Sequence, residues 1–159
     1  MLFFHKDGLI SYWCFKFLLR EHAPNELLQL SDSDLISALG LIRNGKPVRA
    51  AFLLAGKESS IKQHFPGYVW TFLKMISDTE YSDRIDGNTA IPVAVMKIID
   101  RIMADNPITT VKQGLFHFEY RTYPKIALRE AIMNAFCHSD YRIPKWIGYK
   151  ENLNNLFLI

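Results

Sequence analysis

Cysteine is scarce in this chain of 159 residues, and its two cysteines, Cys14 and Cys137, lie far apart with no CxxC pair. A disulfide framework needs several paired cysteines, and a thiolate zinc site needs closely spaced ones. The sequence therefore predicts neither. Because neither is signalled, we expect a protein of a reducing compartment and take the cytoplasm as its location.

Long hydrophobic runs are also missing. The apolar opening segment Met1–Leu19 is interrupted by Lys6, Asp7 and Lys16, and no small-residue cleavage site follows it. No other stretch approaches the roughly 18–20 uncharged apolar residues that a membrane helix needs. The sequence thus predicts neither a signal peptide nor a membrane span, and we expect no membrane partner.

Charge of one sign is not in excess either. The formal net charge is +3, charged residues make up 22% of the chain, and no run of five or six like charges occurs. This composition does not by itself indicate nucleic-acid binding. Hydrophobic residues make up 49%, which is ample for a packed core. We expect a mixed α/β (α+β) fold of short sheet strands packed with helices, ending in a buried helix.

Several glycine signatures are absent from the sequence. It contains no GxxxxGK[ST], GxGxxG or GxSxG string, so a P-loop, a Rossmann dinucleotide site and a nucleophile elbow all lack their glycines. Its five histidines form no HxH or HxxxH pair, so histidine spacing does not indicate a metal site. These chemistries are disfavoured.

Periodicity and capping residues predict a series of short alternating elements. They are a helix near 33–42 with Ser31 and Asp32 as caps and a turn at Asn44-Gly45, a strand covered on both faces at Val48–Ala55, a strand at Tyr68–Ile76, a helix at Ala90–Ala104 preceded by Asn88 and Thr89, a half-buried strand at Leu115–Thr122 and a helix at Pro124–His138. The segment Ile10–Leu19 fits a strand or the start of a helix. Residues 144–159 lack the pattern of a strand with a glycine turn.

Two polar patterns have competing interpretations. His117 and Glu119 alternate with aromatic residues and could be metal ligands, but a solvated strand face is the favoured interpretation. A second group interleaves basic and aromatic side chains and could follow single-stranded nucleic acid, though a strand with a polar edge explains it equally well. This group consists of Lys57, Lys62, His64, Tyr68 and Trp70.

The helix predicted at Pro124–His138 carries the strongest functional pattern. Glu130, Asn134 and His138 recur every fourth residue and so share one ridge. Apolar residues cover most of the remaining surface, from which we expect a largely buried helix. A buried carboxylate and amide cost several kcal/mol unless they find partners, so protein, water or a ligand must fill the space beside the ridge.

Two interpretations of this ridge stay open from the spacing alone. In the first, Glu130 pairs with an Arg or Lys and Asn134 caps a neighbouring loop. In the second, the ridge is part of a magnesium and phosphate site. Mg²⁺ prefers hard oxygen ligands, so the Asn134 amide oxygen could hold it while phosphates complete its coordination. The nearby carboxylate could then orient a water molecule.

The residue types at these positions resemble a known ATPase motif. The run EAIMNAFCH from Glu130 to His138 is similar to the N-box of ATPases of the gyrase, Hsp90, histidine kinase and MutL type. With Tyr123-Pro124 before it and Asp140-Tyr141 after it, the string resembles the YP…ALREAIxNAxxHxDY signature of transcriptional regulators with a RecG-helicase-related, Schlafen-associated ATP-binding region. A weaker likeness to the same family extends over 39–57.

The resemblance implies ATP and Mg²⁺ as cofactors. It implies that Asn134 ligates Mg²⁺ on the ATP phosphates, that Glu130 is the catalytic residue that positions or activates water, and that Arg129 and His138 contact phosphate or brace the loop. It further implies an ATP-binding transcriptional regulator or a RecG-related DNA-acting protein. The alternative is a non-catalytic protein- or nucleic-acid-interaction module that has lost nucleotide binding.

The sequence also departs from this family. Ser139 stands where the family commonly has Arg, and no later glycine-containing box follows Tyr141. We therefore expect a fragment with three parts: 1–30 as the remnant of an AlbA-like domain, 31–122 as an α/β linking domain and 123–159 as the start of a truncated ATP-binding domain. ATP would bind weakly or not at all to this chain, and ATPase activity would need the full-length parent. DNA, contacted through missing regions, and a homo-oligomer stay open as partners.

Overall fold

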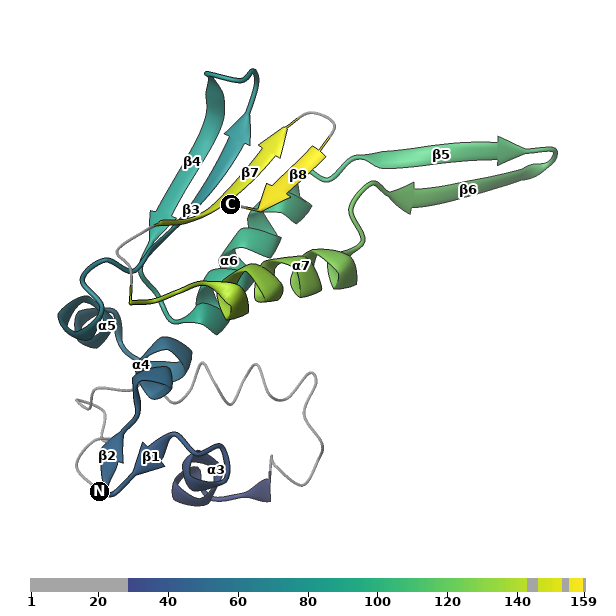
Figure 1. Cartoon of the computed structure of the whole chain (residues 1–159). Coiled ribbons are helices and arrows are strands. Elements are labelled where there is room, and N and C mark those ends of the chain that lie inside the picture. Colours follow the sequence, from purple (N-terminus) through teal and green to yellow (C-terminus); the bar gives the residue numbers. More distant parts are fainter. Residues whose placement is uncertain (1–28, 143–145, 153–154, 159) are drawn as a thin grey trace.

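The computed structural model describes residues 29–142, 146–152 and 155–158 of the chain (Figure 1). It shows a mixed α+β fold, as predicted. The described elements are α3 (Asp32–Ala38), β1 (Ile42–Arg43), β2 (Lys46–Pro47), α4 (Arg49–Ala55), α5 (Glu58–His64), β3 (Val69–Met75), β4 (Tyr81–Gly87), α6 (Ile91–Ala104), β5 (Ile108–Gln113), β6 (Phe116–Arg121), α7 (Lys125–His138), β7 (Trp146–Asn152) and β8 (Asn155–Leu158). The element expected at Ile10–Leu19 lies outside the described residues.

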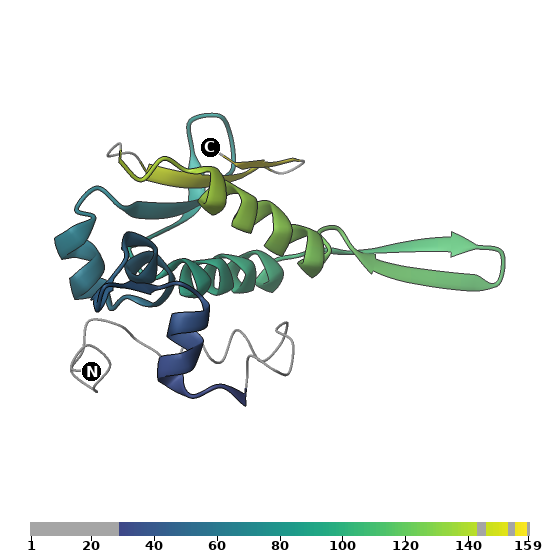
Figure 2. The ribbon, with the colours of Figure 1, turned by 60° about the horizontal axis from the view of Figure 1, so that its bottom comes forward.

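A four-stranded sheet with the order β4-β3-β7-β8 forms one layer of the fold. Strand β3 pairs antiparallel with β4 and parallel with β7, and β7 pairs antiparallel with β8. Helices α6 and α7 lie against one face of this sheet (Figures 1 and 2). The sequence showed no strand pattern over 144–159. That interpretation is wrong, because this segment supplies β7 and β8 of the sheet.

One hydrophobic core joins the sheet to the helices. It takes side chains from α4, α5, β3, α6 and α7, and the largest of those that are almost completely buried are Trp70, Phe72, Phe136, Ile61, Ile98, Ile102 and Ile132. Helix α6 contributes residues three and four apart along its length, which is the apolar stripe predicted for Ala90–Ala104. A second, smaller cluster lies between α3, the β1–β2 hairpin and α4.

Trp70 is held in the core by the segment between β4 and α6. Its Nε1 donates to Thr89 Oγ1 at 3.2 Å, and the Tyr68 hydroxyl donates to the Thr89 carbonyl at 3.0 Å. Thr89 therefore binds β3 and does not cap α6, whose N-cap is Ala90 without a side-chain hydrogen bond. Gly87 pairs with Trp70 across the strands, and a Cβ there would approach the indole ring to 2.2 Å. Only glycine fits at this position.

The other predicted elements are confirmed with one exception. The helix near 33–42 is α3, which is shorter than predicted and is capped by the Ser31 side chain. The predicted turn at Asn44-Gly45 has positive φ at both residues and joins β1 to β2. The strand predicted at Val48–Ala55 is wrong, because this segment forms α4. Its run of Arg, Ala and Leu has high helix propensity, and a short apolar run does not distinguish a strand from a buried helix.

Strands β5 and β6 form a separate two-stranded sheet that projects from the body of the molecule as an arm (Figures 1 and 2). All six residues of β6 are exposed. The prediction of a half-buried strand at Leu115–Thr122 is therefore correct for the strand and wrong for its burial. Aromatic and polar residues do alternate along β6, but no other layer of the described chain covers the arm.

The base of the arm is closed by Asn106, which is only 6% exposed. Its Nδ2 donates to the Tyr123 carbonyl at 2.7 Å, and the Tyr123 N–H donates to its Oδ1 at 3.1 Å. The Thr122 N–H adds a bond to the Pro107 carbonyl at 3.1 Å. These contacts join the chain that enters the arm to the chain that leaves it and leads into α7.

None of the described helices is both long and apolar enough to cross a membrane.

We predict that Asn106→Ala lowers the free energy of unfolding by about 2–3 kcal/mol, because it removes two hydrogen bonds between a buried amide and the Tyr123 backbone. Urea unfolding followed by circular dichroism measures this change. Gln63→Ala, which removes an exposed amide on α5, serves as the control and should change the stability by less than about 0.5 kcal/mol. Equal effects of the two substitutions would contradict the bracing role of Asn106.

Candidate functional site

Helix α7 is attached to the core along one side only. Leu128, Ile132 and Phe136 are 3%, 0% and 0% exposed, whereas Ile126 is 72% exposed and Cys137 is also exposed. The prediction of a largely buried helix is therefore wrong. The apolar side that meets the core was correctly predicted, and Met133 packs against the core beside it. Ile126 and Cys137 face outward because no second layer of the described chain covers them.

The predicted ridge lies on the open side of α7. Glu130, Asn134 and His138 are all exposed. At roughly 100° per residue, the centre of this ridge is almost opposite Ile132, the middle of the buried side. The structure thus places the three side chains together as predicted, but in solvent. The desolvation cost that would require an occupant beside them does not arise.

Arg129, the fourth predicted site residue, borders the ridge. Its guanidinium lies 3.3 Å from a carboxylate oxygen of Glu130, and the two side chains are 32% and 64% exposed. This contact agrees with the pairing of Glu130 in the first of the two interpretations. An exposed ion pair of this kind contributes at most about 1 kcal/mol, so the Glu130 carboxylate could leave it at little cost.

The segment after α7 is anchored by side chains whose role the sequence did not indicate. Ser139 Oγ donates to the Ala135 carbonyl at 2.8 Å, and the Tyr141 hydroxyl donates to the Phe136 carbonyl at 2.6 Å. These bonds add side-chain donors to carbonyls of the last turn, where the regular helical pattern ends. The Phe136 carbonyl also accepts from the Ser139 N–H at 3.4 Å. Tyr141 also packs on Tyr68, with ring centroids 5.9 Å apart, and burial raises its pKa. The end of the ridge is consequently fixed to the core.

Arg142, four residues after the end of α7, is a cation that sequence reasoning missed. Its Nε and a terminal nitrogen donate to the Asp140 carboxylate at 2.9 and 2.8 Å, and its side chain is 82% exposed. The paired carboxylate raises the pKa of the guanidinium, which stays charged. A basic group therefore follows the helix although Ser139 occupies the position where the resemblance suggests Arg.

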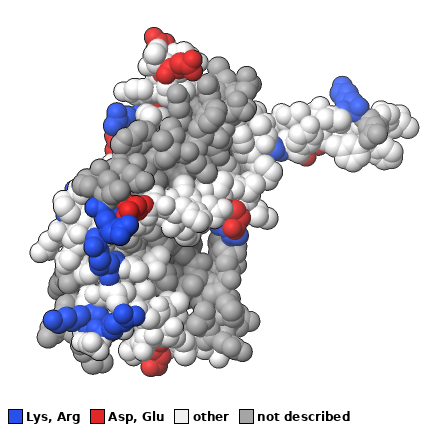
Figure 3. Space-filling view, viewed as in Figure 1, with Lys and Arg blue, Asp and Glu red and all other residues white. Residues whose placement is uncertain are grey.

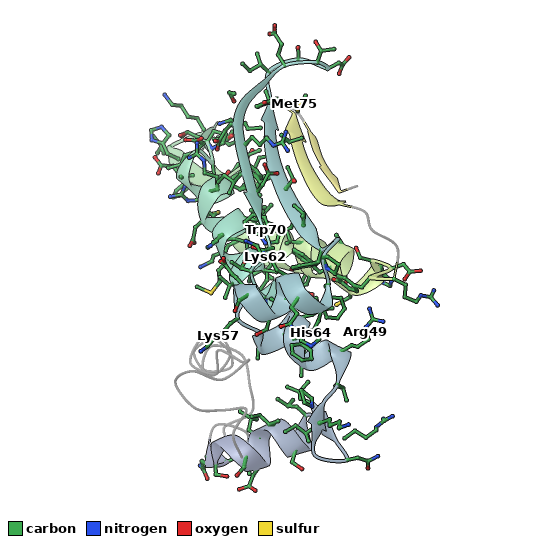
Figure 4. All side chains as sticks on the ribbon, turned by 90° about the vertical axis from the view of Figure 1, so that its left-hand side faces the viewer. Arg49, Lys57, Lys62, His64, Trp70 and Met75 are labelled. Carbon is green, nitrogen blue, oxygen red and sulfur yellow. The ribbon has the colours of Figure 1, made fainter. Side chains whose placement is uncertain are left out.

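The aromatic members of the group that was weighed for nucleic acid are not accessible. Trp70 and Tyr68 are 1% and 5% exposed, so neither can stack on a base. His64 lies on the surface of α5, where its Nδ1 is 2.8 Å from the Ser60 carbonyl and its ring stacks on Phe52 at 4.1 Å (Figure 4). The prediction that bases stack on Tyr68 and Trp70 is wrong, and only the basic side chains of this group reach the surface.

The other candidates lie away from α7. His117 and Glu119 are exposed on β6, in agreement with a solvated strand face, and the described residues contain no group of three His, Cys, Asp or Glu that could hold a metal ion. A cavity of about 290 Å³ lies between the α4–α5 junction and the start of α6. It is mainly apolar, with Lys57, Glu58 and Lys97 at its wall, and none of the predicted site residues lines it.

No family model and no curated protein matches the chain. Among solved structures, the chain is similar to the DIP2311 protein from Corynebacterium diphtheriae, a Northeast Structural Genomics Consortium target. The TM-score is 0.70 at 16% sequence identity, over 89% of this chain. The chain spans 28% of the length of that protein. At this identity the likeness shows the fold alone.

We predict that Ile132→Ala lowers the free energy of unfolding by about 2–5 kcal/mol, because it opens a cavity where α7 meets the core. Ile126→Ala, on the exposed side of the same helix, should change it by less than about 0.5 kcal/mol. Chemical denaturation of both variants measures the difference. A large loss for Ile126→Ala would show that the outward side of α7 is covered in solution.

Proposed function

We propose that this chain is the portion of an ATP-binding transcriptional regulator, or of a RecG-related DNA-acting protein, that carries the helix holding the phosphates of Mg-ATP. The observation that carries the proposal is the arrangement of α7. Glu130, Asn134 and His138 share an open ridge, while the opposite side of the helix is locked into the core. A helix fixed in this way presents its polar groups from an ordered backbone, so only their side chains lose freedom on binding.

The residues on the ridge are chemically suited to this role. The Asn134 amide oxygen is a hard, uncharged ligand of the kind that Mg²⁺ accepts beside phosphate oxygens and water. Glu130 is one turn away and would orient a water molecule, while Arg129 and His138 would contact phosphate. When bound, Mg-ATP would supply the terminal phosphoryl group that is transferred, and the ADP oxygen would be the leaving group. The Glu130 side chain is 64% exposed, and its ion pair with Arg129 is weak enough to be exchanged for a water contact.

The described part of the chain supplies only one wall of such a site. Among the described residues, no other element covers the ridge, and tight binding of a nucleotide requires adenine recognition and phosphate donors placed around it. We therefore propose that other segments of a longer protein complete the site. On its own, the chain would bind Mg-ATP weakly and would not hydrolyse it.

A second candidate function is a non-catalytic interaction module. The specific observation in its favour is the arm, which projects from the body (Figure 1) and exposes aromatic side chains. The two candidates make different demands on the same chain. Only the first requires a nucleotide to contact the ridge.

We predict that Mn²⁺-ATP broadens the backbone amide resonances around Asn134 in the 159-residue chain. Mn²⁺ accepts the same oxygen ligands as Mg²⁺, and its paramagnetism reports even weak contacts. Two-dimensional NMR of the ¹⁵N-labelled chain should give a dissociation constant of about 1 mM or weaker. Asn134→Ala should weaken binding by about tenfold, which corresponds to roughly 1.4 kcal/mol.

Gln63→Ala is the matched control, since it removes an exposed helical amide on α5, and it should leave the broadening unchanged. The nucleotide site would be refuted if the broadened resonances lay far from Asn134. It would also be refuted if Asn134→Ala showed the same broadening as the unmodified chain. In that case the interaction module would be the better account of this chain.

A further inference from the structure

The arm has two chemically different faces. Directly paired residues of β5 and β6 share a face, and successive residues of a strand alternate between faces. One face carries Thr109 with Tyr120, Val111 with Phe118, and Phe116; the other carries Ile108 with Arg121, Thr110 with Glu119, and Lys112 with His117. We call the first the aromatic face. It contains three aromatic side chains and no charged one among its described members.

The aromatic face is open to solvent. Phe116, Phe118, Tyr120 and Val111 are 70%, 52%, 53% and 41% exposed, and the rings of Phe116 and Phe118 lie 6.4 Å apart. A two-stranded hairpin with no covering layer is at best marginally stable in water. An exposed, continuous apolar surface of several hundred Å² usually marks an interaction site. The arm therefore needs an occupant for this face.

The area of the aromatic face fits a symmetric contact between two arms. Taking about 150–250 Å² for each aromatic side chain, the exposed portions amount to roughly 400 Å² per arm. Two such faces would bury about 800 Å². With Leu115 at the tip, which is 97% exposed, and the flanking residues, the total reaches about 1,000–1,200 Å². That clears the threshold of about 1,000 Å² for a specific interface and lies just below the roughly 1,200–2,000 Å² of stable ones, as for a weak dimer.

The charge distribution favours a second copy over nucleic acid. Stacking platforms for single strands combine aromatic residues with a basic groove that follows the phosphates. Here the basic side chains of the arm, Lys112 and Arg121, belong to the opposite face. On the side shown in Figure 3, most of the arm surface is uncharged. Two aromatic faces can meet without like-charge repulsion, whereas phosphates would find no cation there.

The position of the arm also suits this contact. It projects clear of the body (Figure 1), so two arms running in opposite directions can overlap while the two bodies stay apart. Asn106 braces its base, which limits the freedom that would be lost on association. The Val111–Phe118 pair is the middle of the three rows on the aromatic face. In a two-fold arrangement this pair would lie at the axis.

We propose that the chain forms a homodimer through its arms, with the aromatic face of one arm packed on the aromatic face of a second copy. The contact is isologous and leaves the ridge of α7 outside the interface. It rests on the exposure and register of β5 and β6 and is independent of the proposed nucleotide site.

Sedimentation velocity of the 159-residue chain over a range of concentrations tests the proposal. The unmodified chain should sediment as a dimer. Phe118→Glu places a charge at the centre of the aromatic face and should raise the dimer dissociation constant by about 30-fold or more. His117→Glu is the matched control, since the neighbouring residue faces the other way, and it should leave the dimer intact. Phe116→Glu, on the same face as Phe118, should repeat the effect of Phe118→Glu.

Circular dichroism must show the same secondary structure in all variants, which we expect because these side chains lie outside the core. A monomer at every concentration would overturn the proposal, as would equal weakening by Phe118→Glu and His117→Glu. A monomeric chain that binds a fluorescent single-stranded oligonucleotide, and loses it in Phe118→Glu, would assign the arm to nucleic acid instead.

Discussion

The packing of α7 against the core is the constraint on which the rest of this structure depends. Leu128, Ile132 and Phe136 belong to the same buried cluster as Trp70 and Phe72 of β3 and the apolar stripe of α6. Once that side of the helix is buried, its rotation is fixed, and the opposite ridge must face outward. The same contact places the arm, because the base of β6 leads directly into α7. The packing of α7 on the core thus sets the position of both candidate binding surfaces, the ridge of α7 and the aromatic face of the arm.

The ridge and the arm differ in what their exposure implies. Polar side chains on the ridge are solvated at little cost, so their openness permits a ligand without requiring one. Aromatic side chains on the arm leave apolar surface in water, which costs roughly 25 cal/mol for each Å². The arm therefore makes the stronger thermodynamic demand for a partner, whereas the ridge has the more specific chemistry.

Much of the candidate site was readable from the sequence, because helical periodicity is a local property. The limits of α7, the shared ridge of Glu130, Asn134 and His138 and the apolar side opposite it all follow from residue order. The degree of burial does not. Ile126 and Cys137 are apolar and yet exposed, since burial requires a second element on that side and the sequence does not state where other elements lie. The anchoring of the segment after α7 by Ser139 and Tyr141 was missed for a related reason, because a side-chain bond to a nearby carbonyl leaves no periodic signal.

The sequence by itself determined the positions of five elements, through capping residues, turn residues and apolar spacing: α3, β3, α6, β6 and α7. It did not indicate α5, β4, β5, β7 or β8. It misassigned α4, where a short apolar run is compatible with either structure. Only the tertiary structure decided that Trp70 and Tyr68 belong to the core, that Thr89 holds them, and that β6 stands away from the body in a two-stranded arm. The physical reason is that local propensity acts between neighbours in the chain. Burial depends on contacts between distant segments, and it is burial that distinguishes a binding surface from a core.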